Sequence, residues 1–342
     1  MIEHLHLRIR EIIQETSDCK TFIFENSDLR YKAGQFLTFI IPARTTRIRR
    51  AYSFCTELQT DNFPGVTVKR VENGAASRYM FNSWQVGDEV ECIQPAGKFI
   101  FDENAAGELN LFAAGIGIVP IYSILKQALH SSKIQRIHLF YSNRSKESTI
   151  FLQQLSQLEH QFPNKLLIKW FFSDSFRILD ARINSDLIDT FFKKQTLPNK
   201  EQVHVFACGP ESFMYLVEVR SLFSGIPKEN YHQEVFYRED SESHTPHKFK
   251  DGNFEVIVHK DGKTYTMLVA GNQTILSQAI KNEIPLTWSC ASGRCSTCMC
   301  KLDSGKVYMS RNEVLTDRDL LKGSILTCTS YPQEGPISIS FS

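Results

Sequence analysis

The chain has 342 residues, a length that exceeds one ordinary hydrophobic core and indicates two or three domains. Hydrophobic residues make up 42% of it and charged residues 23%, values that argue against a disordered, fibrous or collagen-like chain. Because 39 lysines and arginines nearly balance 38 acidic residues, no broad basic surface for nucleic acid or an anionic membrane is expected.

Neither a membrane span nor a secretory signal is predicted. A long stretch without a charged residue, Leu109–Leu125, is interrupted by two glycines and Pro120, so we expect a buried strand, turn and helix there. Residues 1–4 are not a basic segment leading into an apolar run, as a signal peptide would require. A cytoplasmic location is therefore expected.

The first part of the chain, residues 1–103, shows short alternating apolar runs separated by glycine, proline and asparagine. Several short strands at this spacing predict an antiparallel β-barrel. The runs are Leu5–Ile9, Phe22–Phe24, Phe36–Ile41, Val66–Val68 and Val90–Ile93.

Two motifs in this barrel pattern are suited to a phosphorylated aromatic ligand. The first motif is Arg50, Ala51, Tyr52 and Ser53, and the second is Gly74, Ala75, Ala76 and Ser77. Arginine offers a planar fork for a phosphate, tyrosine a flat face and serine a small donor. The glycine and the small residues after it are expected to open a helix whose first N–H groups suit a pyrophosphate. Arg44, Arg47 and Arg49 crowd the same segment, either as ligand contacts or as a solvated basic loop.

Residues 104–237 show a different pattern, in which continuous apolar runs alternate with segments of helical period. This alternation predicts an α/β domain with a parallel sheet and crossover helices. The predicted strands are Leu109–Ala114, Ile137–Tyr141, Leu166–Phe172 and Val203–Ala207, and the predicted helices are Ile121–Leu129, Phe151–His160 and Phe213–Phe223.

Two of these strands end in turns that suit a dinucleotide. Gly115, Gly117 and Pro120 follow the first strand, and Cys208, Gly209 and Pro210 follow the last. Glycines allow a close backbone approach, and the carboxyl ends of parallel strands are the usual position of such a site. The second strand leads into Ser142 and Arg144 with no acidic residue beside them, which favours NADPH over NADH.

Nine cysteines are present, and four of them have a distinctive spacing. Cys290, Cys295, Cys298 and Cys328 follow the plant-type pattern of a [2Fe–2S] cluster, in which the last thiolate ligand lies far downstream. A structural zinc site is the alternative, but zinc usually takes two short Cys pairs and only one occurs here. Cys300 fits no ligand position and is expected to be a small half-buried residue. A polar segment, residues 238–252, is predicted to link this part to the rest, and a hairpin is expected around Asp261 and Gly262.

The first two parts of the chain resemble the ferredoxin–NADP reductase superfamily, on the R-x-Y-S, G-x-G-x-x-P and C-G-P motifs quoted above. The resemblance implies FAD rather than FMN, with Arg50 at the flavin phosphate, Tyr52 beside the flavin ring and Ser53 near flavin N5. It implies that residues 74–77 hold the pyrophosphate and that the Cys208 turn lies against the nicotinamide. Glu234, in an E-x-F ending, would lie near the flavin, so Ser53, Cys208 and Glu234 are the implied catalytic residues. Ile116 and Val119 stand where many relatives have Ser or Thr.

Residues 253–342 resemble a plant-type ferredoxin, which implies an α+β domain of the β-grasp type. The whole chain resembles the reductase components of phenylacetyl-CoA epoxidase and related oxygenases. This resemblance implies electron transfer from NAD(P)H through FAD to the cluster and on to an oxygenase partner, with a diiron epoxidase favoured. A reductase of a Rieske-type or other hydroxylase, or a non-catalytic redox-sensing module, are the alternatives.

Overall fold

The computed structural model describes residues 4–25, 28–43, 46–72, 74–176, 181–194, 199–236, 249–288, 291, 293, 296–312 and 314–341. Two compact units are present in it. The larger comprises His6–Pro95 and Phe99–Tyr237, and the smaller comprises Arg238–Ser342 with Met1–Leu5 and Ala96–Lys98. Most of the predicted linker lies outside the described residues, which resume at Phe249. No helix among the described residues is long and apolar enough to cross a membrane.

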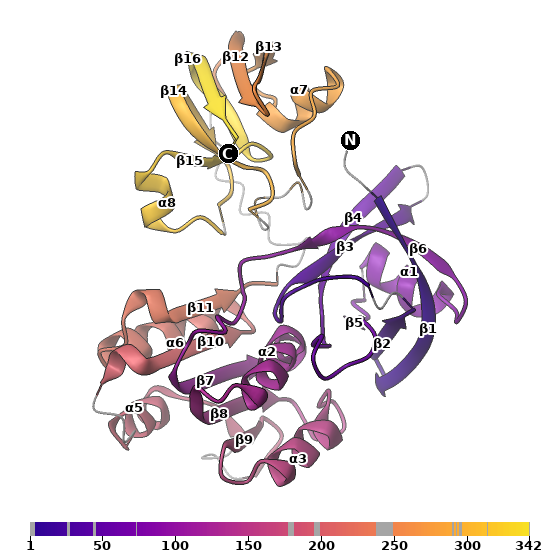
Figure 1. Cartoon of the computed structure of the whole chain (residues 1–342), viewed down its shortest axis with the longest axis vertical. Coiled ribbons are helices and arrows are strands. Elements are labelled where there is room, and N and C mark those ends of the chain that lie inside the picture. Colours follow the sequence, from indigo (N-terminus) through magenta and orange to yellow (C-terminus); the bar gives the residue numbers. More distant parts are fainter. Residues whose placement is uncertain are drawn as a thin grey trace. The chain divides into compact units, whose positions relative to one another are not determined.

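The first domain of the larger unit is the expected β-barrel (Figure 1). Its elements are β1 (His4–Thr16), β2 (Cys19–Phe24), β3 (Phe36–Ala43), β4 (Thr46–Ser53), β5 (Gly65–Lys69), α1 (Ala75–Ser83) and β6 (Glu89–Ala96). The strand order is β4-β3-β6-β1-β2-β5, and an antiparallel bridge between Phe54 and Val66 joins the two outer strands. This bridge brings the two ends of the sheet together, so the sheet curves into a barrel.

The barrel core is aromatic, as the alternating apolar runs predict. Phe22 and Phe39 are fully buried. Both pack edge to face against Trp84, the residue after α1, with ring centroids 5.1 and 5.2 Å apart. This packing attaches α1 to the barrel through its C-terminal end. The beginning of α1, where the phosphate motif lies, is therefore held in place by buried side chains.

The second domain of the larger unit is a five-stranded parallel sheet in the order β11-β10-β7-β8-β9. Its strands are β7 (Gly107–Ala114), β8 (Ile134–Asn143), β9 (Leu166–Phe172), β10 (Val203–Cys208) and β11 (Tyr231–Glu234). Its helices are η1 (Gly115–Gly117), α2 (Ile118–His130), α3 (Leu152–Gln161), α5 (Ser185–Lys194), η2 (Lys200–Gln202), α6 (Glu211–Phe223) and η3 (Lys228–Asn230). The strand order reverses between β7 and β10, so the ends of these two strands flank the place where nucleotides bind in such sheets.

The four strands and three helices expected here are all present, but β11 and α5 are not among the predicted elements. β11 is a four-residue strand at the edge of the sheet with the sequence YHQE, which has no apolar run to mark it. β11 forms because it pairs with β10, and such tertiary pairing cannot be predicted from the periodicity of the sequence.

The smaller unit contains the predicted α+β domain. Its elements are β12 (Asn253–Lys260), β13 (Lys263–Ala270), α7 (Ile275–Lys281), β14 (Met299–Met309), α8 (Asp317–Leu321), β15 (Ser324–Leu326) and β16 (Ser330–Ser340). The order is β13-β12-β16-β14-β15, with β12 and β16 parallel. The expected hairpin is confirmed, because β12 and β13 pair antiparallel on either side of Asp261 and Gly262, both with positive φ as a tight type I′ turn requires.

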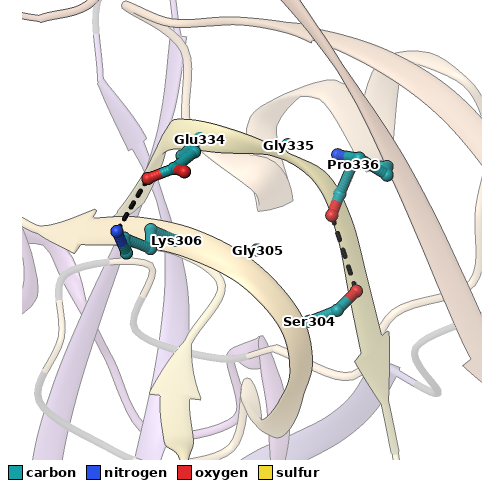
Figure 2. Close-up of a pocket in the computed structure, with 6 residues that line it drawn as sticks. All are labelled: Ser304, Gly305, Lys306, Glu334, Gly335 and Pro336. Atoms are coloured by element: carbon teal, nitrogen blue, oxygen red, sulfur yellow. Dashed lines mark hydrogen bonds and ion pairs between the residues drawn. The ribbon is translucent and has the colours of Figure 1, made fainter.

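A shallow hollow lies between β14 and β16 (Figure 2). Its two charged side chains, Lys306 and Glu334, pair with each other at 2.8 Å. Ser304 Oγ is directed to the Pro336 carbonyl at 3.5 Å. These polar groups therefore bond to one another across β14 and β16.

Candidate active site and cluster site

Ser53 and Glu234 meet although 181 positions separate them in the chain. Ser53 is the last residue of β4 in the barrel, and Glu234 is the last residue of β11 in the parallel sheet. The Ser53 hydroxyl donates a hydrogen bond of 3.0 Å to Glu234 Oε2. Ser53 is 4% exposed and Glu234 is half-buried, and their contact joins the two domains of the larger unit.

Cys208 lies beside this pair. It ends β10 and is the register partner of Glu234 in the parallel ladder between β10 and β11. The thiol is fully buried, and burial, reinforced by the Glu234 carboxylate, raises its pKa well above the ordinary value. Desolvation raises the Glu234 pKa to about 8, while the Ser53 hydrogen bond acts to lower it. The site thus presents a neutral thiol, a hydroxyl and a carboxyl group that holds its proton near neutrality.

The other residues of the first barrel motif lie along β4. Arg50 Nη1 donates to the Arg49 carbonyl at 2.7 Å, and the Tyr52 ring lies 6.2 Å from the Phe39 ring. Burial raises the Tyr52 pKa, so its phenol stays neutral. Ala51 is exposed between them and pairs with Thr38 of β3. β4 therefore supplies a flat side chain and a guanidinium within one strand, as a flavin site needs.

The basic residues around this motif have different positions. Arg47 pairs with Glu91 of β6, and burial lowers the Arg49 pKa to about 10. Arg44 lies outside the described residues. The Arg47 guanidinium is thus paired with Glu91 on the barrel surface.

The small-residue motif opens α1, as expected. Gly74 is the residue before the helix, and no described side chain caps the first turn. The N–H groups of Ala75, Ala76 and Ser77 are those that an α-helix leaves without intrahelical partners, so they can bind an anion. The Ser77 hydroxyl, however, accepts from the Val71 N–H at 3.1 Å and donates to the Gly74 carbonyl at 3.3 Å. It therefore shapes the turn, and the helix backbone is the part of the motif left for a pyrophosphate.

The glycine turn after β7 touches the turn after β10. An added Cβ at Gly117 would lie 2.2 Å from the Cys208 carbonyl oxygen, and one at Gly209 would lie 2.9 Å from Ala114. Gly115 has a φ of +54°, and its carbonyl accepts from the Tyr141 hydroxyl at 3.1 Å. The two turns thus form one backbone-lined edge at the topological switch point of the sheet.

Two prolines border this edge. Pro120 lies in the first turn of α2, where its missing N–H costs no hydrogen bond, and Pro210 precedes α6. Both prolines therefore mark helices that begin at the carboxyl ends of β7 and β10, where the positive ends of the helix dipoles favour an anion.

Ser142 and Arg144 lie at the end of β8, on the same sheet edge. Ser142 is the register partner of Ala114, the last residue of β7, and is half-buried. Arg144 is exposed, and its backbone carbonyl accepts from the Asp174 N–H at 3.1 Å. A guanidinium exposed at this edge is a suitable partner for an anionic group.

Two of the four predicted cluster ligands lie together in the smaller unit. Cys298 and Cys328 are 2% and 6% exposed, and their sulfur atoms are 3.2 Å apart. The Gly293 N–H donates to Cys328 Sγ at 3.3 Å. Gly293 has a φ of +78°, and an added Cβ would lie 2.8 Å from the Arg311 carbonyl, so only glycine fits this position. Cys290 and Cys295 lie outside the described residues.

This donor set fits an iron–sulfur cluster. Thiolates are the soft ligands that such clusters take, and backbone N–H groups directed at sulfur are among the features that set their potential. Cys300, two residues beyond Cys298, is buried, whereas the sequence predicts a half-buried residue. Burial raises the pKa of its thiol.

Three family models match consecutive parts of the chain. The oxidoreductase FAD-binding domain matches residues 6–101, the oxidoreductase NAD-binding domain matches residues 111–218, and the 2Fe-2S iron-sulfur cluster binding domain matches residues 258–333. Together they define the class of the protein, an oxidoreductase with FAD-binding, NAD-binding and 2Fe–2S domains in one chain.

The curated relatives identify the family. The ferredoxin reductase component of 3-ketosteroid-9-alpha-monooxygenase from Mycobacterium tuberculosis is 31% identical over 98% of this chain and 96% of its own length. A component of the 1,2-phenylacetyl-CoA epoxidase from Escherichia coli is 28% identical over 98% of this chain and 97% of its own length. The chain therefore belongs to the family of oxygenase reductase components that includes these two proteins.

Solved structures agree with this assignment. Phthalate dioxygenase reductase, described as a modular structure for electron transfer from pyridine nucleotides to [2Fe-2S], is 26% identical with a TM-score of 0.63. The match covers 99% of this chain and 98% of that structure. An intact type IV self-sufficient cytochrome P450 monooxygenase shares the fold over 98% of this chain and 41% of its own, with a TM-score of 0.74 and 20% identity.

One set of buried and half-buried polar residues near the site is not predicted by any motif. Thr56, Asp61, Ser123 and Lys126 connect the barrel to α2, within the larger unit. A charged residue inside an apolar helical segment is the one signal that the sequence offers, because Lys126 interrupts the run before Ala128 and Leu129.

Proposed function

We propose that this chain is the reductase component of an oxygenase system, taking electrons from NAD(P)H and delivering them singly to an oxygenase partner. The observation that carries the proposal is the Ser53–Glu234 hydrogen bond beside Cys208, which brings the predicted flavin strand to the predicted nicotinamide turn. Bound FAD would accept a hydride from the nicotinamide and release single electrons to the cluster.

The chain's own residues bind, orient and exclude water in this proposal. Arg50 and the first turn of α1 bind the flavin phosphates, and Tyr52 packs beside the flavin ring. Ser53 donates to Glu234 and is thereby held in one orientation next to the reacting atoms. Buried Cys208 closes the site from the nicotinamide side, and its neutral thiol adds no charge that would oppose hydride transfer.

The coenzyme and cluster sites complete the assignment. Gly115, Gly117, Pro120, Gly209 and Pro210 line the dinucleotide edge. Ser142 and Arg144 are proposed to meet the adenosine ribose and to favour a 2′-phosphate, and hence NADPH. Cys290, Cys295, Cys298 and Cys328 are proposed as the four ligands of the [2Fe–2S] cluster. The proposed domain boundaries are residues 1–103, 104–237 and 253–342 with a linker at 238–252, and the proposed location is cytoplasmic.

The favoured partner is a diiron oxygenase of the phenylacetyl-CoA epoxidase kind. The similarity to the Escherichia coli epoxidase component over 98% of the chain supports it. A hydroxylase of the ketosteroid kind is the second candidate, supported by the 31% identity to the Mycobacterium tuberculosis reductase component.

Coupled turnover separates the two candidates. The purified holo-protein is incubated with NADPH and, in separate reactions, with a purified epoxidase or a purified ketosteroid hydroxylase component. Formation of the epoxide with stoichiometric coenzyme oxidation supports the first partner, and hydroxylated steroid supports the second. A protein that reduces one-electron acceptors but drives neither oxygenase contradicts both partner assignments. The matched control is Cys298→Ser, which should drive neither reaction.

A further inference from the structure

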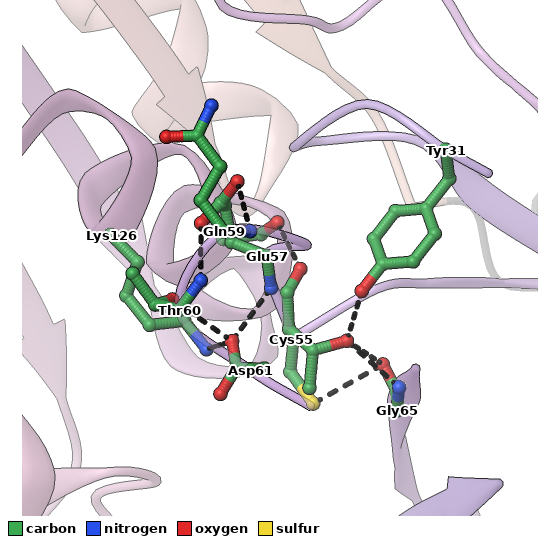
Figure 3. A network of polar contacts seen from close by, with 10 residues as sticks. Tyr31, Cys55, Glu57, Gln59, Thr60, Asp61, Gly65 and Lys126 are labelled. Atoms are coloured by element: carbon green, nitrogen blue, oxygen red, sulfur yellow. Dashed lines mark hydrogen bonds and ion pairs between the residues drawn. The ribbon is translucent and has the colours of Figure 1, made fainter. Parts of the chain in front are cut away.

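A buried polar network connects the barrel to helix α2 (Figure 3). The Ser123 hydroxyl donates to the Thr56 carbonyl at 2.6 Å, and Lys126 Nζ donates to Asp61 Oδ2 at 2.5 Å. Ser123 is fully buried, the Lys126 side chain is 9% exposed, and the Asp61 side chain is 30% exposed. The two helix residues lie three positions apart, so they share the face of α2 that is turned to the barrel loop. We call these four residues the interdomain clamp.

The loop that carries the barrel half of the clamp is internally rigid. Glu57, 4% exposed, accepts from the N–H groups of Gln59 at 3.0 Å and Thr60 at 3.1 Å. Asp61 Oδ2 accepts from the Glu57 N–H at 2.7 Å in addition to Lys126. A buried carboxylate that accepts a hydrogen bond at each oxygen fixes the backbone around it, so this loop moves as one unit.

The barrel also holds Thr56 from its other side. The Tyr31 hydroxyl is 2.6 Å from Thr56 Oγ1, the same oxygen accepts from the Gly65 N–H at 2.8 Å, and the Tyr31 ring stacks on Phe54 at 3.7 Å. Thr56 is thus anchored to the strand that begins at Gly65. It stands three residues after Ser53, the proposed flavin contact.

The helix half of the clamp lies on the helix that begins at the proposed dinucleotide edge. α2 begins at Ile118, directly after Gly117, whose backbone touches the Cys208 turn. Ser123 and Lys126 lie within the first three turns of this helix. A short, rigid route therefore connects the residue beside the flavin to the backbone edge that holds the dinucleotide.

We infer that Ser123 and Lys126 are positioning residues for hydride transfer, which set the separation of nicotinamide and flavin by tying α2 to the loop after β4. The inference rests on the proposed function and assigns a role within that same site. Hydride transfer depends steeply on this separation, because a displacement of about 1 Å far from the chemistry can cost about 100-fold in rate. A partly buried ion pair that served stability alone would leave the rate unchanged when removed.

The test replaces Lys126 by Met, which keeps the apolar stem and removes the charge. Lys165→Met is the matched control, because Lys165 Nζ donates to the carbonyls of Leu129 and Ser131 at the other end of α2 without touching the barrel. Flavin content, thermal unfolding and anaerobic flavin reduction by saturating NADPH are measured in the holo-protein. The primary isotope effect with coenzyme deuterated at the nicotinamide C4 is measured in parallel.

Lys126→Met is expected to retain its flavin and to reduce it about tenfold or more slowly at saturating coenzyme, with an altered isotope effect. Lys126→Arg, which can still reach Asp61, should recover most of the rate, and Lys165→Met should lose stability but not rate. A Lys126→Met protein that is destabilised yet reduces its flavin at the wild-type rate overturns the inference.

If Lys126→Met does not fold, Ser123→Ala removes one hydrogen bond of the clamp and keeps the ion pair. A slower flavin reduction with unchanged coenzyme affinity supports the inference, and an unchanged rate overturns it. Failure of the proposed function itself has a different signature, since the wild-type holo-protein would then be reduced by neither NADPH nor NADH.

Discussion

The contact between Gly117 and the Cys208 turn predicts the effect of one added methyl group. In Gly117→Ala the new Cβ would lie 2.2 Å from the Cys208 carbonyl oxygen, 2.5 Å from its carbon and 2.9 Å from the Gly209 nitrogen. All three are backbone atoms, so no side chain can rotate away to make room. The end of β10 and the beginning of α2 must separate instead.

The size of the separation follows from packing. Side-chain carbons almost never approach another atom within 3.0 Å, so the Cys208 carbonyl has to move by about 1 Å. Overpacking of this kind typically costs about 1–3 kcal/mol of folding free energy. In the proposed site this displacement would change the separation of flavin and nicotinamide, and a change of about 1 Å can cost about 100-fold in rate. We therefore expect a folded protein with intact flavin and a strongly reduced rate.

The assay is anaerobic flavin reduction by NADPH, together with thermal unfolding and flavin content. Gly225→Ala is the matched control in the same domain. Gly225 has a φ of +84° with nothing within 4 Å of an added Cβ, so this variant meets backbone strain but no clash. It should lose about 1–2 kcal/mol of stability and keep its rate. Equal rates for Gly117→Ala and the wild type would refute the close contact of the two turns.

Three further predictions concern the carboxyl group, the cluster and the coenzyme. The Glu234 pKa is raised from 4.5 to about 8, so between these pH values the folded protein holds a proton that the unfolded chain has released. The contribution of this proton to the free energy of unfolding therefore falls as the pH rises from about 4.5 through about 8. Glu234→Gln should therefore show a flatter dependence of unfolding temperature on pH in this window, and an unchanged slope would contradict the assignment. Cys298→Ser should abolish electron transfer to cytochrome c while NADPH still bleaches the flavin, because cluster and flavin belong to different domains; loss of flavin reduction would show that the domains depend on each other. Arg144→Ala should raise the KM for NADPH by roughly tenfold to a hundredfold, since a charge-assisted contact is worth about 1.5–3 kcal/mol. It should change the KM for NADH little. Equal effects on both coenzymes would argue that Arg144 is only a surface residue.

The parts of this fold that could be predicted are those with strong local signals. The barrel strands and the buried strands of the parallel sheet carry apolar runs, and the hairpin at Asp261 and Gly262 carries the residues that its turn needs. β11 could not be predicted from periodicity, because it is a four-residue edge strand with polar side chains. Glu234, which lies on β11, is expected only through the resemblance of its motif.

The site shows the same division. Spacing alone indicates the four cysteines, and the glycine turns indicate the dinucleotide edge. The pairing of Lys126 with Asp61 could not be predicted, because it arises from the docking of two domains whose contacting residues are 65 positions apart. Residues 74–77 are expected at the pyrophosphate, and within this motif the Ser77 hydroxyl bonds to the backbone of its own turn. Local hydrogen bonding of serine to a nearby backbone group competes with ligand binding in a way that composition does not reveal.

The central claim is that electrons pass from NAD(P)H through the flavin to a [2Fe–2S] cluster within this one chain. Rapid mixing of the oxidised holo-protein with NADPH under anaerobic conditions tests it, with flavin absorbance followed in time and samples frozen for electron paramagnetic resonance. We predict that the flavin bleaches first and that the signal of a reduced [2Fe–2S] cluster then appears, and that Cys298→Ser shows only the first event. A flavin that is fully reduced while no cluster signal develops in the wild-type protein would contradict the claim.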